Sequence, residues 1–230
     1  MTRRILLAVA AAAAVLAAPR LAIAQSAPAP SNPARAALAT LDRQADALFA
    51  AVFKRDWTGA RIALDGTKAA VDALRAQSFE GAYADAGGRM EVLYAARHRL
   101  DAATAQADIA VGATDGPSAM DSANRLTEVV WQLGAPIEPP LVQQTRRLSF
   151  LARELEYARA VGNSVHYAET VAAIRQLWSG LRRALAARKP APDLAALDAA
   201  IARLGDGRRA DPAAVAALLA AAGSLRTSVG

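Results

Sequence analysis

The sequence repeats one spacing of apolar residues after three polar residues, Asp56, Asp115 and Asn163. Counting forward by 4, 8, 11, 15 and 18 residues from each of them reaches an apolar or small side chain at every step. The positions are Ala60, Leu64, Thr67, Val71 and Leu74; Ala119, Ala123, Leu126, Val130 and Leu133; and Tyr167, Val171, Ile174, Trp178 and Leu181. Alternating steps of four and three residues follow one face of an α-helix. The spacing therefore predicts a helix after each polar residue, with one face in a core.

A second stripe precedes the same polar residues, and a fourth copy surrounds Asp211. The preceding stripes are Leu41, Ala45, Leu48 and Val52; Leu100, Thr104, Ala107 and Val111; Leu148, Ala152 and Leu155; and Leu194, Leu197, Ile201 and Leu204. After Asp211 the fourth copy keeps Val215, Leu219 and Ala222 and then drifts. Asp and Asn are favoured helix N-caps, and Pro212 suits the first position of a helix. Each polar residue thus lies between two helices, which predicts four helical hairpins.

The composition favours an all-α fold. Alanine is abundant, β-branched residues are sparse and only 5% of residues are aromatic, so the chain holds helix-forming rather than sheet-forming residues. Because 54% of residues are apolar and 21% charged, the chain lacks the composition of a disordered protein. We expect about eight helices arranged as four antiparallel hairpins. The pattern leaves two packings open, a helical-repeat stack or two four-helix bundles.

Glycine and proline divide the chain between hairpins. Hairpins one and two are expected within residues 37–133, a proline-rich linker within 134–142, and hairpins three and four within 143–230. Gly81, Gly87 and Gly88 predict that the helices also stop between hairpins one and two, over residues 76–89.

The N-terminus is typical of a secretory signal peptide. Residues 1–24 combine Arg3 and Arg4, an apolar run and the small-residue cleavage site that ends at Ala24. Residues 25–36 then form a proline-rich leader that is expected to be flexible. The signal and the richness in alanine and arginine favour a periplasmic protein of a Gram-negative cell. The paired arginines also fit a twin-arginine signal, so the export route stays open.

Charge and cysteine content exclude several classes of partner and site. Cleavage removes three arginines and no acid, so the net charge falls from +6 to about +3, which argues against a nucleic-acid partner. The chain has no cysteine and therefore no disulfide, thiolate metal site or cysteine-attached haem. We expect a soluble mature protein without a membrane span, because no apolar run after the signal reaches the length of a membrane helix.

One alternative is a metal- or haem-handling bundle. Met90, His98 and Asp101 follow one helical face, and His166 is the only other histidine. Imidazole binds copper, zinc or iron, and a thioether favours Cu(I). However, Met90 and His98 lie about 12 Å apart along a helix, so His166 would have to come from another helix. Haem would need axial His or Met from the same residues. No cofactor is predicted otherwise.

The sequence favours a binding protein over an enzyme, although it leaves enzymatic activity open. It has no metalloprotease, nucleophile-elbow or P-loop motif. Trp57 lies beside a predicted cap and Trp131 one residue off its stripe, so both are candidate contact residues, whereas Trp178 lies on its stripe and is assigned to the core. We expect an exported helical-repeat protein that acts as an interaction module in the periplasm, with another periplasmic protein or a small ligand as its partner.

The first turn resembles the turn of a tetratricopeptide hairpin. Residues 54–60 place Trp57 after a short polar turn and Ala60 three residues later. The resemblance covers seven residues of one copy, and the repeats here are 48 residues or longer rather than about 34. It implies a similar hairpin shape and not membership of that family.

Overall fold

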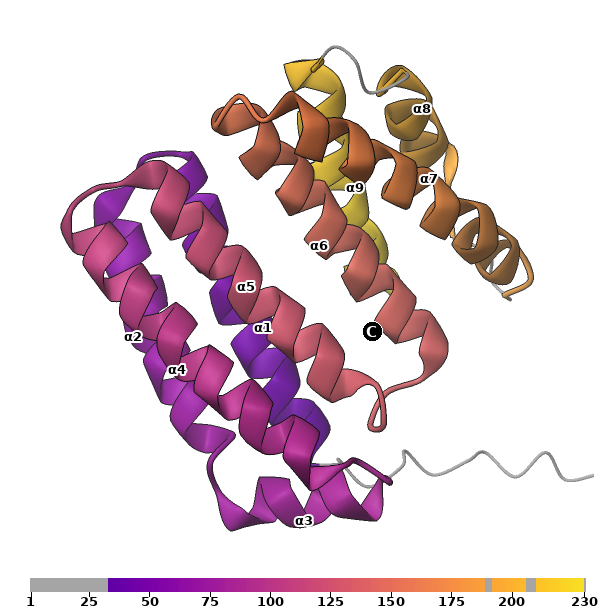
Figure 1. Ribbon diagram of the computed structural model, residues 1–230. Coiled ribbons are helices and arrows are strands. Elements are labelled where there is room, and N and C mark those ends of the chain that lie inside the picture. Colours follow the sequence, from indigo (N-terminus) through magenta and orange to yellow (C-terminus); the bar gives the residue numbers. More distant parts are fainter. Residues whose placement is uncertain (1–32, 189–191, 206–209, 230) are drawn as a thin grey trace, which may run out of the picture. The chain divides into compact units, whose positions relative to one another are not determined.

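The computed structural model describes residues 33–188, 192–205 and 210–229, which form helices and no strand (Figure 1). The helices are α1 Pro33–Phe53, α2 Trp57–Ala73, α3 Gln77–Asp85, α4 Met90–Gly112, α5 Gly116–Gly134, α6 Pro140–Ala160, α7 Ser164–Ala186, α8 Ala195–Arg203 and α9 Pro212–Val229. The predicted all-α fold is confirmed. The predicted signal peptide, its cleavage site and residues 25–32 of the leader lie outside the described residues.

Two predicted boundaries differ from those of the helices. Helix α1 begins at Pro33, so residues 33–36 of the predicted leader are helical. Proline is suited to the first turn of a helix, and the fully buried Ala34 gives this turn a packing contact. The predicted linker is also shorter than residues 134–142, because α5 ends at Gly134 and α6 begins at Pro140.

The repeated stripes form the interior. Every forward position of the first three copies is buried, and of the preceding stripes Thr104 and Leu194 are only half-buried. In α9 the core contains Leu218, and the predicted Leu219 is half-buried. The fourth stripe therefore runs one residue earlier than predicted at this position.

Three of the hairpin turns share one backbone geometry. The residue before each polar cap has a positive φ: 58° at Arg55, 55° at Thr114 and 72° at Gly162. The backbone N–H of each capping residue donates to the carbonyl oxygen five residues earlier. The N–O distance is 2.9 Å for Asp56, 2.8 Å for Asp115 and 2.9 Å for Asn163. This six-to-one bond with a left-handed residue is the Schellman motif. The side chains of Asp56, Asp115 and Asn163 then cap the following helix, as predicted.

Helix α3 is a correction to the predicted helix-free segment at residues 76–89. Its side chains Phe79 and Tyr83 lie one turn apart, are almost fully buried and stack with their ring centroids at 6.1 Å. Burial of two aromatic rings outweighs the cost of about 1 kcal/mol for a glycine inside a helix. The helix ends at Asp85, and the chain then turns at Gly87, where φ is +82°. The interval from Asp56 to Asp115 is eleven residues longer than the interval from Asp115 to Asn163. Helix α3 lies within the longer interval.

The helices form two bundles, each with its own hydrophobic core. Helices α1, α2, α4 and α5 contact one another in a closed ring, with α3 packed on α1. Helix α6 packs on α7 and α9, and α9 packs on α8. Trp178 of α7 closes the second ring by donating its indole N–H to Asp198 of α8 at 2.9 Å. The two buried apolar clusters belong to these two sets of helices. Of the two predicted packings, the helices therefore adopt two four-helix bundles.

Helix α9 belongs to the second bundle. Among the described residues it is long and apolar enough to cross a membrane by length and composition, and 28% of that window is buried. It contributes Val215, Leu218 and Leu225 to the second core. At its end, Arg226 reaches the first bundle.

Buried ion pairs join the two bundles. Asp42 of α1 pairs with Arg146 of α6 at 3.1 Å and with Arg226 at 3.2 Å. Arg146 also pairs with Glu138 at 2.9 Å, and the Gln143 side chain donates to Glu138 at 2.6 Å. Among the described helices, only α5 and α6 make an extensive contact between the bundles, so long arginine side chains span much of the remaining joint. We call the cluster of Asp42, Glu138, Arg146 and Arg226, together with Asp46 and Arg153, the ionic seam.

Arg153 is the most enclosed cation of the ionic seam. It is 4% exposed, donates to Thr127 Oγ1 at 2.6 Å, pairs with Asp46 and lies over the Phe49 ring at 5.6 Å. Burial lowers the pKa of Arg153 to about 10, so it remains protonated at neutral pH. Its charge therefore depends on Asp46 and Thr127 across the joint, because burying a charge without partners is costly.

We expect Thr114→Gly to raise the free energy of unfolding by about 0.5–1 kcal/mol, because a β-branched residue is strained at positive φ and glycine is not. Urea unfolding measures the change. The neighbouring Ala113→Gly is the control, since Ala113 has φ −81° and should lose stability with glycine. Equal losses in both variants would contradict the strain at Thr114.

We expect Arg153→Met to lower the free energy of unfolding by about 3 kcal/mol, because it removes one side of a buried ion pair. Arg125→Met is the matched control: Arg125 pairs with Asp121 on the surface, 59% of its side chain is exposed, and its loss should cost less than about 1 kcal/mol. Chemical unfolding of both variants tests the seam, and similar losses would show that it contributes no more than a surface pair.

Candidate functional site

Large apolar side chains are exposed mainly around three hairpin turns. Of the six such side chains in the described part of the chain, five lie within six residues of a capping Asp56, Asp115 or Asn163. These five are Phe53, Ile62, Ile109, Val161 and Val165, and the sixth is Tyr94. The three turns lie toward the same end of the helices (Figure 1). We call the surface formed by residues 53–57, 113–117 and 160–164, together with the five side chains near the caps, the turn face. Tyr94 is not part of it.

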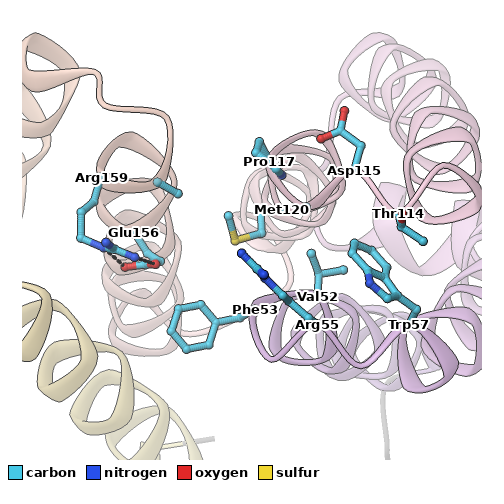
Figure 2. A pocket seen from close by; sticks show the side chains of 12 residues that line it. Val52, Phe53, Arg55, Trp57, Thr114, Asp115, Pro117, Met120, Glu156 and Arg159 are labelled. Atoms are coloured by element: carbon cyan, nitrogen blue, oxygen red, sulfur yellow. Dashed lines mark hydrogen bonds and ion pairs between the residues drawn. The ribbon is translucent and has the colours of Figure 1, made fainter.

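The turn face contains a cavity of about 550 Å³ between three helix ends. Figure 2 shows its side chains converging from the α1–α2 turn, the α4–α5 turn and the end of α6. The lining residues are Val52, Phe53, Arg55, Trp57, Thr114, Asp115, Gly116, Pro117, Met120, Glu156, Arg159 and Ala160. Its volume lies within the range of small-molecule pockets. We call it the turn-face cavity.

One part of the turn-face cavity is apolar. Val52 and Met120 are buried at its base. Trp57 is half-buried, and Phe53 is 45% exposed at the edge. Aromatic and thioether groups of this kind provide contact area for an apolar ligand group.

Two of the charged groups in the cavity are already paired within the protein. Arg159 donates two hydrogen bonds to the nearly buried Glu156, at 2.8 and 2.5 Å, and this contact raises the pKa of Arg159. A third group, the carboxylate of Asp115, accepts from the backbone N–H and hydroxyl of Ser118 at 3.3 and 2.6 Å. Glu156 and Arg159 therefore form an ion pair, whereas Asp115 is hydrogen-bonded by neutral groups and keeps its negative charge.

Arg55 is the remaining cation. Its side chain forms no hydrogen bond or ion pair with another described residue. In Figure 2 the guanidinium extends into the cavity toward Met120, whereas the Asp115 carboxylate points away from it. The turn-face cavity therefore combines an apolar wall with one guanidinium that forms no ion pair.

Two smaller cavities extend the hollow across the turn face. One of about 350 Å³ shares Asp115 with the turn-face cavity and is lined by Ile109 and Tyr157. Another of about 200 Å³ shares Arg159 and includes Asn163 and Tyr167. The turn face is thus indented on both sides of its central cavity.

The two predicted contact residues have different surroundings. Trp57 is partly exposed in the turn-face cavity, which makes it available to a ligand. Trp131 is also half-buried, but the Arg147 guanidinium lies 5.2 Å from its ring centroid, so this side chain contacts α6. Trp178 is in the core, as predicted.

The predicted metal ligands lie on two helices, three on α4 and one on α7. Met90, His98 and Asp101 are all on α4; Met90 packs on the first core, His98 is exposed, and Asp101 pairs with Arg75. His166 is on α7, where its Nε2 lies 2.6 Å from Glu154. The described residues contain no group of three or more His, Cys, Asp or Glu side chains arranged to hold a metal ion. No hydrogen bond or ion pair joins His166 to Met90, His98 or Asp101.

Sequence reasoning identified Trp57 and missed Phe53, Arg55 and Met120. Phe53 and Arg55 flank the predicted turn, and both lie outside the buried stripe, which ends at Val52. Their position beside a cap was a usable signal. Met120 follows the predicted core residue Ala119, and only the packing of three helix ends places it in a cavity.

No protein-family model, curated protein or solved structure matches this chain.

Anionic and neutral quenchers of tryptophan fluorescence test the charge of the turn-face cavity. We expect Arg55→Gln roughly to halve the quenching of Trp57 by iodide, because the local positive charge concentrates the anion, and to leave quenching by acrylamide unchanged. Comparison with the Trp57→Phe chain isolates the emission of Trp57. Lys54→Gln removes a neighbouring charge outside the cavity lining. An equal fall in iodide quenching with Lys54→Gln would contradict a local effect of Arg55.

Proposed function

We propose that this protein is an exported binding module that holds a partner protein on its turn face. The grouping of five exposed apolar side chains near three hairpin turns, with Phe53 lining the turn-face cavity, carries this proposal. Exposed apolar side chains that gather at one end of a protein are a feature of interaction surfaces. The capped turns support it further, because they fix the position of the exposed side chains.

The composition of the turn face fits protein binding. Trp57 and Arg55 are residue types that contribute strongly to interfaces when they pack in pockets. Phe53, Ile62 and Ile109 add apolar contact area around them. The two bundles provide a helical frame whose turns carry the contact residues, as binding loops on rigid scaffolds do.

The proposed location is the periplasm, with removal of the signal peptide after Ala24. Residues 1–24 support export by their order of basic, apolar and small residues. The absence of cysteine lets the chain fold in an oxidising compartment without disulfide formation.

Photocrosslinking in the host cell tests the function and the location together. A photoreactive phenylalanine at position 53 should crosslink a discrete partner, because Phe53 is exposed beside the turn-face cavity. Mass spectrometry of the product should also contain a peptide that begins at Gln25 and ends at Arg35, since Arg35 is the first tryptic site after the predicted cleavage.

The same photoreactive residue at position 94 is the control. Tyr94 is 50% exposed, similar to Phe53, but lies about 27 Å along α4 from its end at the turn face. Crosslinking of the same products from both positions, or of none from position 53, would reject the turn face as the binding surface. A peptide that still contains Met1 would reject export with cleavage.

A further inference from the structure

We propose that the turn-face cavity recognises a carboxylate that lies next to an apolar side chain on a peptide segment of the partner. Arg55 supplies the opposite charge, and Phe53, Trp57 and Met120 supply the apolar wall. This inference rests on the proposed binding function and specifies the chemistry that the binding surface selects.

The unpaired guanidinium of Arg55 carries the choice of a carboxylate. Glu156 pairs with Arg159, and the Asp115 carboxylate points away from the cavity, so neither acid forms an ion pair with Arg55. A ligand carboxylate would therefore meet an unpaired guanidinium, whose planar donors match carboxylate oxygens. A cationic ligand group would meet the same charge and be repelled.

The conformation of Arg55 supports a role in binding. Its φ of 58° lies in the left-handed region, where a residue with a side chain costs about 1 kcal/mol or more relative to glycine. The equivalent position of the α6–α7 turn is Gly162, which makes the same turn without that cost. The turn therefore does not need an arginine here, and strained residues of this kind often occur at ligand sites.

The space beside Arg55 determines the rest of the ligand. Trp57 and Phe53 offer ring surfaces on the α1–α2 side, and Met120 faces them from α5 (Figure 2). A carboxylate alone would leave this wall exposed to water. An aromatic or aliphatic side chain next to the carboxylate would cover it and add the burial of apolar area to the ion pair.

N-acetylphenylalanine and its primary amide are matched probes for this proposal. They share the aromatic group and differ in the carboxylate. Binding is followed by the chemical shift of the Trp57 indole N–H, assigned through Trp57→Phe. We expect the acid to bind about tenfold more tightly than the amide, the ratio for about 1.4 kcal/mol from a hydrogen-bonded charge. Trp131 serves as an internal control, because it does not line the cavity.

Three variants identify the source of the preference. Arg55→Gln should weaken binding of the acid to the level of the amide, Arg55→Lys should retain part of the preference, and Lys54→Gln should retain all of it. Lys54 is the neighbouring cation outside the cavity lining. The far-ultraviolet spectrum and unfolding transition of each variant establish that the fold is kept.

The outcomes separate this inference from the proposed function. Equal binding of acid and amide to the wild-type chain, or a preference that survives Arg55→Gln, would overturn carboxylate recognition and leave the crosslinking result intact. A loss of crosslinking from position 53 together with an Arg55-dependent preference would reject the partner surface and retain the carboxylate site. A Trp57 signal that responds to neither probe would overturn the inference.

Discussion

The paired burial of charge between the two bundles is the constraint on which their arrangement depends. Each bundle has its own apolar core, and Tyr157 of α6 also packs against the first core, so apolar contact between the bundles is small beside the burial within each. The ionic seam fixes how one bundle meets the other, because Asp42 must lie within reach of both Arg146 and Arg226. Arginine–carboxylate pairs have a directional geometry, and separating one side of a buried pair leaves a charge without its partner, which is costly.

The turn face follows from this arrangement. The turn-face cavity needs residues of α1, α5 and α6, and only the joint between the bundles brings α6 beside the other two. Glu156 and Arg159 on α6 form one side, and Arg55 on the first hairpin forms the other. The candidate site therefore depends on the ionic seam, which holds the bundles together, as well as on the turns that line the cavity.

The repeat predicted most of the fold, because its signal is local. Four-and-three spacing with a capping Asp or Asn identifies a hairpin from residues close in the chain, as at Asp56 and Asp115. Helix α3 was missed because Gly81 and Gly87 outweighed the pair Phe79 and Tyr83, whose value depends on burial against other helices.

The candidate site was less predictable than the hairpins. The position of Trp57 beside a cap indicated exposure, but the lack of a partner for Arg55 is a property of the assembled helix ends. The ionic seam has no sequence signal of its own, since Asp42, Arg146 and Arg226 are separated by up to 184 residues. Residue spacing reports neighbours on one helix, whereas both of these features depend on which helices meet.

The shared turn geometry also has an evolutionary consequence. Arginine, threonine and glycine occupy the same left-handed position in three turns without altering the hydrogen bonds that close them. The cap and the backbone hold each hairpin, so the exposed positions beside it are free to change identity under selection. A chain built this way can acquire a new specificity by substitution at its loops while inheriting its framework unchanged.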